Sequence, residues 1–209
     1  ARLSFENGTV AEAEIVIGAD GINSTVRELI LGHEEPTYTG FVAHRAIFPR
    51  SLVKAAIPHD LTKWWSDHNH EANDDLHILT YYLDRGREEI YIVSGVPDPN
   101  WDSGVSYVDA DLDEMISVFD GFHDDLMQVL YACPAATKWP LLDRDPLPLW
   151  STGRVVLLGD ACHPMKPHMG QGAAMAAEDA AVLVRCLEHF GFEDSKAAFD
   201  LYEVSRKAR

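Results

Sequence analysis

Asp160 is the residue whose neighbours in the sequence most clearly suggest chemistry. It follows residues 155–158, an apolar run that begins with β-branched side chains and is too short for a helix, so the run predicts a buried strand that ends at Gly159. A carboxylate at the carboxyl end of such a strand can accept hydrogen bonds from the hydroxyl groups of a ribose or ribityl chain. The sequence therefore predicts a ligand contact at Asp160.

The loop after Asp160 suggests a second kind of contact. Prolines stiffen this loop, while Gly170 and Gly172 let the backbone approach a ligand and leave the N–H groups of the next helical turn free. The residues after Gly172 are mainly Ala, Met, Val and Leu, which predicts a helix buried on most of its surface. The N-terminus of that helix would favour a group with partial negative charge. The alternative is an ordinary strand-to-helix connection of an α/β domain.

A second polar motif follows another apolar run near the start of the chain. Residues 15–17 predict a strand, and Asp20 and Gly21 predict the turn that ends it. Ser24 is a suitable N-cap for a short helix that stops at Gly32. This motif has the same order of strand, acidic turn and helix as the stretch around Asp160.

The elements that must position these motifs form a mixed helix and sheet pattern. The expected elements are a hairpin with strands at 3–5 and 10–17 around Asn7-Gly8, antiparallel strands at 41–48, 76–83 and 89–95, a helix at 109–133 that Gly121 kinks or divides, an extended segment at 139–150, and a last helix at 195–209. In the strand at 76–83, His77, Leu79 and Tyr81 share one face because strand side chains alternate. His77 and Tyr81 can therefore reach one pocket together.

Composition excludes several classes of function. Lys and Arg total 17 and Asp and Glu total 34, which gives a formal net charge of −17 that would repel nucleic acid and anionic membranes. The apolar runs are far shorter than a membrane span, and the first residues lack the apolar core of a signal peptide. Three cysteines without paired spacing fit a reducing compartment. We expect a cytoplasmic protein with neither nucleic acid nor membrane as partner.

A metal site is the alternative for the cluster of Cys162, His163 and His168. The sequence shows no fourth ligand at a recognised spacing, and both histidines lie in a loop that has another explanation. We therefore expect no metal.

Read together, GADGINSTVR near the start and GDACHPMKPHMGQGAAMAAEDA near the end resemble the flavin-dependent aromatic hydroxylases. The wording CHPMKPHMGQG is most similar to the branch that acts on salicylate and 6-hydroxynicotinate. The resemblance covers essentially the whole chain. It implies an α/β fold, α+β overall, with parts of a Rossmann-like FAD-binding domain at 1–35 and 151–209 and an antiparallel-sheet substrate domain at 36–150.

The resemblance also implies roles for particular residues. Asp160 would hold the ribityl or ribose hydroxyls of FAD, and the flavin ring would be lined by Pro167, Gly170, Gln171 and Gly172. The residues near the FAD pyrophosphate and the reduced nicotinamide, NADH or NADPH, would be Asp20, Gly21 and Arg27. For Arg27 the alternative is an ordinary exposed helix cation.

The substrate would be a small aromatic carboxylate, with O₂ as the second reactant. His77 and Tyr81 would hold its carboxylate or ring hydroxyl, and His168 would contact it or assist removal of the hydroxyl proton. The alternative for His77 and Tyr81 is a purely structural role, as a hydrogen-bonded His and a buried Tyr of the sheet. Arg45, on the same sheet, is a weaker candidate for an anion partner, and we favour a surface cation there. A homodimer remains open.

One departure from the family pattern is large. The fingerprint G-x-G-x-x-G after an N-terminal strand is absent, and the chain starts inside a hairpin. We expect an amino-terminal segment to carry it, so that this chain alone holds FAD poorly. The predicted function is hydroxylation, with loss of CO₂, of a substrate such as salicylate or 6-hydroxynicotinate. The alternatives are a hydroxylase or epoxidase without decarboxylation and a non-catalytic binding module.

Overall fold

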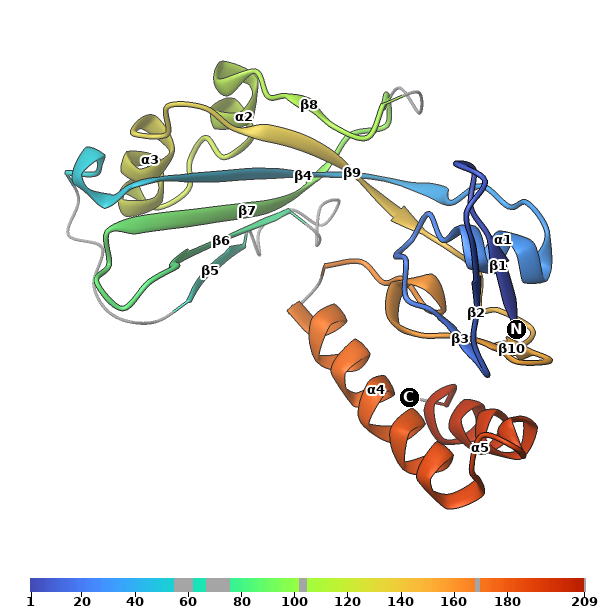
Figure 1. Cartoon of the computed structure of the whole chain (residues 1–209). Helices are drawn as coiled ribbons and strands as arrows, with labels where there is room; N and C mark the ends of the chain where they lie inside the picture. The colour runs from blue at the N-terminus through green and yellow to red at the C-terminus, as the bar shows by residue number, and fades with distance from the viewer. Residues whose placement is uncertain (55–61, 67–75, 102–104, 168–169, 209) are drawn as a thin grey trace. The chain divides into compact units, whose positions relative to one another are not determined.

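The computed structural model describes residues 1–54, 62–66, 76–101, 105–167 and 170–208, and these residues form two compact units. The first unit comprises Ala1–Thr37 and Leu142–Arg209, and the second comprises Tyr38–Leu141. Helices and sheets occur in both, which confirms the mixed fold class (Figure 1). No helix in these described ranges is long and apolar enough to span a membrane.

The first unit contains two small sheets and three helices among its described residues (Figure 1). Its strands are β1 (Arg2–Ser4), β2 (Val10–Glu12), β3 (Val16–Gly18), β10 (Ser151–Thr152) and β11 (Val155–Leu157), and its helices are α1 (Thr25–Leu31), α4 (Gln171–Phe190) and α5 (Ser195–Arg206), with a 3₁₀ turn η2 (Gly159–Ala161). β1 and β2 form the expected hairpin around Asn7-Gly8. β3 lies beside β11 in a sheet of order β10-β11-β3.

The strand expected at 10–17 is in fact two strands. β2 pairs antiparallel with β1, whereas β3 pairs parallel with β11. One continuous strand could not serve both sheets, so the chain leaves one sheet and enters the other between them. The apolar alternation alone did not reveal that break.

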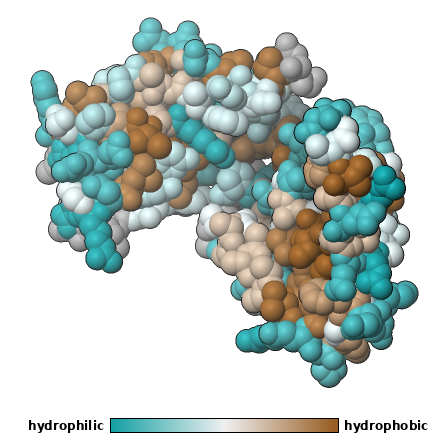
Figure 2. All heavy atoms as spheres, in the orientation of Figure 1, coloured by the Kyte–Doolittle hydropathy of each residue, from teal (hydrophilic) through white to brown (hydrophobic). Residues whose placement is uncertain are grey.

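The prediction that the alanine-rich helix is buried on most of its surface is wrong. Only Asp179, Leu183 and Cys186 of α4 are buried, and apolar residues lie at the surface of this unit (Figure 2). α4 packs against α5 and η2, which together cover one stripe of it. Alanine is the best helix former and is tolerated on an exposed face, so an alanine-rich sequence does not by itself indicate burial.

The second unit is a six-stranded sheet with helices on one face (Figure 1). The strands of this sheet are β4 (Thr37–Pro49), β5 (Lys63–Ser66), β6 (His77–Tyr82), β7 (Glu89–Pro97), β8 (Val108–Asp109) and β9 (Thr137–Asp143), in the order β5-β6-β7-β4-β9-β8. β4 starts one residue before the unit and β9 ends two residues beyond it. The helices are α2 (Leu112–Val118) and α3 (Asp124–Tyr131), with a 3₁₀ turn η1 (Arg50–Leu52). Between α2 and α3, Gly121 adopts a φ of 86° that favours glycine, so the helix expected at 109–133 is divided.

Alternation along the strands gives this sheet two different faces. Ile78, Ile92 and Phe48 belong to a core with Phe119 of α2's end and Leu126 of α3. The residues between them in each strand therefore point away from the helices. His77, Leu79 and Tyr81 are among these, so the expectation that they share a face agrees with the strand register.

Candidate functional site

The two acidic motifs, far apart in the sequence, meet at one edge of the small sheet in the first unit. β3 and β11 are parallel neighbours, with Gly18 opposite Leu157, and the N–H of Leu158 donates to the carbonyl of Gly18 over 2.9 Å. Asp20 and Asp160 therefore both follow the carboxyl ends of adjacent parallel strands. In open α/β sheets, ligands bind outside this edge.

Asp160 lies beside the first turn of α4. Its carboxylate is exposed, and its Oδ1 is 3.9 Å from the point where a Cβ on Gly172 would sit. The N-cap of α4, Gly170, adopts a left-handed φ of 64° and supplies no side-chain hydrogen bond to the helix. The edge therefore combines an acceptor carboxylate with helical N–H groups that no N-cap side chain occupies.

The remaining residues expected around the flavin ring surround this helix start. Pro167 and Gln171 are exposed, and the N–H of Gly170 approaches the carbonyl of Pro167 at 3.4 Å. His168, which was expected to act in catalysis, lies outside the described residues. Where the chain is described, no group of three or more His, Cys, Asp and Glu side chains could hold a metal ion.

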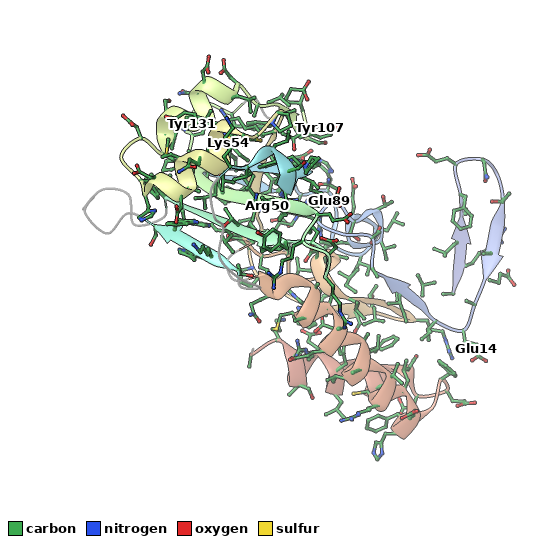
Figure 3. The ribbon with its side chains drawn as sticks, turned by 90° about the vertical axis from the view of Figure 1, so that its left-hand side faces the viewer. Glu14, Arg50, Lys54, Glu89, Tyr107 and Tyr131 are labelled. Atoms are coloured by element: carbon green, nitrogen blue, oxygen red, sulfur yellow. The ribbon has the colours of Figure 1, made fainter. Side chains whose placement is uncertain are left out.

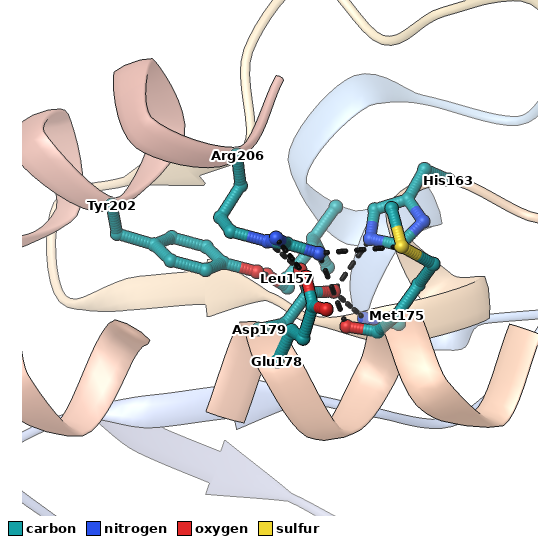
Figure 4. A network of polar contacts seen from close by, with 8 residues as sticks. Leu157, His163, Met175, Glu178, Asp179, Tyr202 and Arg206 are labelled. Carbon is teal, nitrogen blue, oxygen red and sulfur yellow. Dashed lines mark hydrogen bonds and ion pairs between the residues drawn. The ribbon is translucent and has the colours of Figure 1, made fainter. Parts of the chain in front are cut away.

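A buried network ties the loop of Asp160 to both C-terminal helices (Figure 4). Asp179 of α4 is fully buried, and its Oδ2 accepts from the N–H of Gly159 over 3.1 Å and lies 2.5 Å from Nε2 of His163. Its other oxygen accepts from Nε of Arg206 in α5 over 2.6 Å. Gly159 has a φ of 62°, so the strand turns sharply there. The network therefore holds Gly159 by its backbone and His163 by its side chain, one on each side of Asp160.

Electrostatics favour the charged forms in this network. The hydrogen bond to Asp179 raises the pKa of His163. Burial by itself would raise the pKa of Asp179, but the hydrogen bonds from His163 and Arg206 outweigh it and hold that pKa below its ordinary value. Arg206 also pairs with Glu178 at 2.7 Å. Two acids and two bases are thus matched within the described part of the first unit.

Sequence reasoning missed this network, although one signal for it was present. Glu178 and Asp179 are acidic residues in an alanine-rich helix, and a charge in an apolar helix indicates a paired partner, because an unpaired buried charge is costly. The partner, Arg206, is far away in the sequence, and no local spacing identifies it.

In the other acidic motif, Asp20 and Arg27 have different environments. The Asp20 carboxylate accepts from the hydroxyl of Ser24 over 2.5 Å and from the N–H of Val26 over 3.1 Å, so it supports the start of α1, whose N-cap is Ser24 as predicted. Burial raises the pKa of Asp20, but these hydrogen bonds outweigh that effect and lower it. Gly21 has a φ of 79°.

Arg27 is not the exposed helix cation considered as an alternative. It is 4% exposed, and its Nη1 is buried without a hydrogen-bond partner among the described residues. Arg27 lines a small cavity of about 120 Å³ together with Ser24 and Arg144. Glu28, Glu34 and Glu35 line this cavity as well. A buried donor without a hydrogen-bond acceptor costs free energy, so an acceptor at Nη1 of Arg27 would be stabilising.

In the second unit, His77 and Tyr81 lie on the sheet face without helices. His77 is 9% exposed and stacks on Trp64 with ring centroids 4.4 Å apart. Tyr81 meets Tyr91 edge to face at 5.1 Å. Burial raises the pKa of Tyr81, Tyr91 adds to this, and the charge of Arg45 opposes it. Both side chains are therefore packed against aromatic rings on the open face.

Comparison with known proteins gives a consistent result. Residues 3–209 match the family described as FAD binding domain. The chain is 56% identical over 209 residues to 6-hydroxynicotinate 3-monooxygenase of Bordetella bronchiseptica, covering 100% of this chain and 53% of that protein. It is 50% identical to the enzyme of the same name from Pseudomonas fluorescens, covering 99% of this chain and 52% of that protein. The chain thus spans about half the length of these relatives.

Two solved structures of aromatic hydroxylases are also similar to this chain. A salicylate hydroxylase substrate complex has a TM-score of 0.81 and 31% identity, covering 100% of this chain and 54% of that chain. A 2,6-dihydroxypyridine-3-hydroxylase from Arthrobacter nicotinovorans, at 24% identity and a TM-score of 0.80, shares the fold, covering 99% of this chain and 56% of that chain.

The described residues fit part of an FAD molecule. The Asp160 carboxylate suits the hydroxyls of the cofactor's sugar-like chain, and the uncapped start of α4 suits a ring edge with negative charge. Gly172 leaves the space between them free of a side chain. With its two acidic motifs on one sheet edge and its match from residue 3 to residue 209, the chain belongs to the FAD binding domain family.

Proposed function

We propose that the protein carrying this chain is an FAD-dependent monooxygenase that uses NADH or NADPH and O₂ to hydroxylate a small aromatic carboxylate. The observation that carries this proposal is that Asp20 and Asp160 follow the carboxyl ends of β3 and β11, which are adjacent parallel strands. The relatives named 6-hydroxynicotinate 3-monooxygenase support 6-hydroxynicotinate as the first substrate to test.

The part of the chain around Asp160 and the start of α4 binds and orients FAD. When bound, FAD supplies the activation of O₂ with electrons from the reduced nicotinamide. Asp160 accepts hydrogen bonds from the ribityl or ribose hydroxyls, and the residues around the start of α4 line the ring: Pro167, Gly170, Gln171 and Gly172. The N–H groups of that first turn stabilise negative charge at the ring edge. Asp20, Gly21 and Arg27 serve the pyrophosphate and the nicotinamide.

On the substrate side, the open sheet face provides polar groups between aromatic walls. His77 and Tyr81 hold the carboxylate or the ring hydroxyl, and the stack of His77 on Trp64 supports its orientation. His168 assists removal of the proton from the ring hydroxyl, which makes the ring carbon more nucleophilic. The walls also exclude water from the reacting carbon.

The reaction proposed for 6-hydroxynicotinate replaces the carboxyl group by a hydroxyl group. The bond from ring carbon to carboxyl carbon breaks, and a bond to one oxygen atom of O₂ forms. The other oxygen atom leaves as water, two electrons come from NADH or NADPH, and CO₂ is released. Hydroxylation with the carboxyl group retained is the alternative, and release of CO₂ distinguishes the two.

The test uses the complete natural chain purified with its flavin. We expect 6-hydroxynicotinate to stimulate NADH or NADPH oxidation and to release CO₂. Asp160→Asn should weaken flavin retention, whereas Asp200→Asn on the exposed face of α5 should not. His77→Gln and Tyr81→Phe should raise KM with the flavin retained. No stimulation by any member of a panel of hydroxylated aromatic acids would refute the proposal.

A further inference from the structure

The second unit contains a cavity of about 460 Å³ that the proposed function does not use. Arg45 of β4, Tyr91 of β7 and Trp139 of β9 line it, and Asp109 and Thr137 lie at its wall. Apolar side chains such as Ile47 complete the lining. All of these residues belong to the same compact unit.

Arg45 is the cationic side chain that lines this cavity, which Asp109 also lines. Its Nε is buried and makes no hydrogen bond within the described residues. The guanidinium lies over the ring of Trp139, with Cζ 5.4 Å from the centroid. The chain has 34 acidic and 17 basic residues, yet none of the ion pairs found among its described residues involves Arg45. A buried donor of this kind costs free energy unless a ligand accepts from it.

The aromatic frame around Arg45 is held in place. The indole N–H of Trp139 donates to the hydroxyl of Thr137 over 2.8 Å. The hydroxyl of Thr137 in turn donates to the carbonyl of Arg45 over 3.3 Å. Tyr107 stacks on Trp139 with ring centroids 4.5 Å apart and an angle of 18° (Tyr107 is labelled in Figure 3). A preorganised guanidinium beside apolar and aromatic walls suits a planar organic anion.

We propose that this cavity is a second binding site, and that it takes a small aromatic carboxylate whose carboxylate group pairs with Arg45. The ring of the ligand packs against Tyr91, Ile47 and Ala136, which line the cavity. The volume exceeds that of an inorganic anion, and the apolar walls would not favour one. The inference rests on the cavity alone and needs neither the flavin nor the site at His77.

The second site lies on the same open sheet face as His77 and Tyr81, because Arg45 and Ile47 alternate with the core residues Ala46 and Phe48 and Ile47 is opposite Tyr91. Tyr91 lines the cavity and also contacts Tyr81 edge to face. A ligand that neutralises Arg45 would remove a charge that favours ionisation of Tyr81. Occupancy of the cavity should therefore alter the affinity of the His77 and Tyr81 site, which is the behaviour of an effector site.

The test measures the stoichiometry of salicylate binding to the complete natural chain by calorimetry, with salicylamide as the uncharged probe. We expect two sites for each chain. Arg45→Gln should weaken one of them at least about tenfold, Arg45→Lys should weaken it less, and Arg85→Gln in the exposed β6–β7 turn should change neither. Salicylamide should not occupy the Arg45 site.

Variants at the other site separate this inference from the proposed function. His77→Gln with Tyr81→Phe should remove the other binding event and leave the Arg45 event. If the proposed function fails, the site that depends on Arg45 should still be present. A single site that is lost with His77 and Tyr81 and unchanged in Arg45→Gln would overturn the inference, as would equal binding of salicylamide. Binding of phosphate with the same affinity as salicylate would also overturn it.

Discussion

At the scale of single residues, we expect the loss of the Asp179 carboxylate to lower the free energy of unfolding strongly. Asp179 is fully buried and joins Arg206, whose side chain is 2% exposed, to the backbone of Gly159. Asp179→Ala would leave the arginine charge buried without its partner, so we expect the free energy of unfolding to fall by about 3–5 kcal/mol. Urea denaturation checks this. Glu178→Ala is the matched control, and it should cost much less because Glu178 is 45% exposed.

The pair of His163 and Asp179 also predicts how stability depends on pH. The folded pKa of His163 is raised above 6.5, so its contribution is complete below about pH 6.5 and is lost as pH rises through the folded pKa. The folded pKa of Asp179 is lowered below 3.8, so its contribution is present above that pH and is lost as pH falls through the folded pKa. We expect the pair to stabilise most between these limits. In urea titrations against pH, His163→Gln should flatten the decline on the alkaline side; an unchanged slope would contradict the assignment.

At Gly95 of β7, a single added methyl group should displace the side chain of His77, which we propose binds the substrate. A Cβ there would lie 2.4 Å from Cε1 of His77, which is too close for any contact. We expect Gly95→Ala to destabilise the protein because the imidazole is held against Trp64 and cannot move freely. In a double-mutant cycle by urea denaturation, the cost should shrink in the His77→Ala background. Equal costs in both backgrounds would show that the clash lies elsewhere.

At the scale of elements, the packing of α1 on the small sheet depends on Gly18. A Cβ on Gly18 would lie 2.8 Å from Val26 of α1 and 2.9 Å from Leu157 of β11. Gly18→Ala should therefore push α1 away from the sheet and cost about 1–3 kcal/mol. Ile17→Ala is the control, since Ile17 is 46% exposed. Thermal unfolding compares the two, and an equal effect would argue against close packing at Gly18.

The elements themselves were largely predictable, and the exceptions have physical reasons. The hairpin at Asn7-Gly8 follows from a local turn preference, and alternation placed His77 and Tyr81 on one face of β6. The exposure of α4 was mispredicted because alanine favours helices on any face. The break between β2 and β3 was missed because it depends on which partner strand each one meets. Local sequence determines whether a segment forms a helix or a strand more directly than it determines which other elements that segment packs against.

At the scale of the whole chain, the candidate site was predictable only in its pieces. Each acidic motif was visible as a strand followed by a turn, but the parallel pairing of β3 with β11 that unites them is a long-range contact. The anchor of Asp179 on Arg206 and the cavity at Arg45 likewise join distant segments. The assignment of one unit to FAD and the other to substrate stays a prediction, as do the roles of His77, Tyr81 and His168.

The two hydrophobic cores predict how the chain loses structure. Phe119 lies in a cluster built only from the second unit, and Phe199 in a cluster built only from the first. A substitution at either position removes contacts from its own core alone. Phe119→Leu should therefore lower the hydrogen-exchange protection of amides in β7 more than in α5, and Phe199→Leu should do the reverse. Their effects on unfolding free energy should add to within about 0.5 kcal/mol, because the two side chains share no packing partner in these clusters. Equal loss of protection in both cores from either substitution would show that they open as one cooperative unit, and would contradict this prediction.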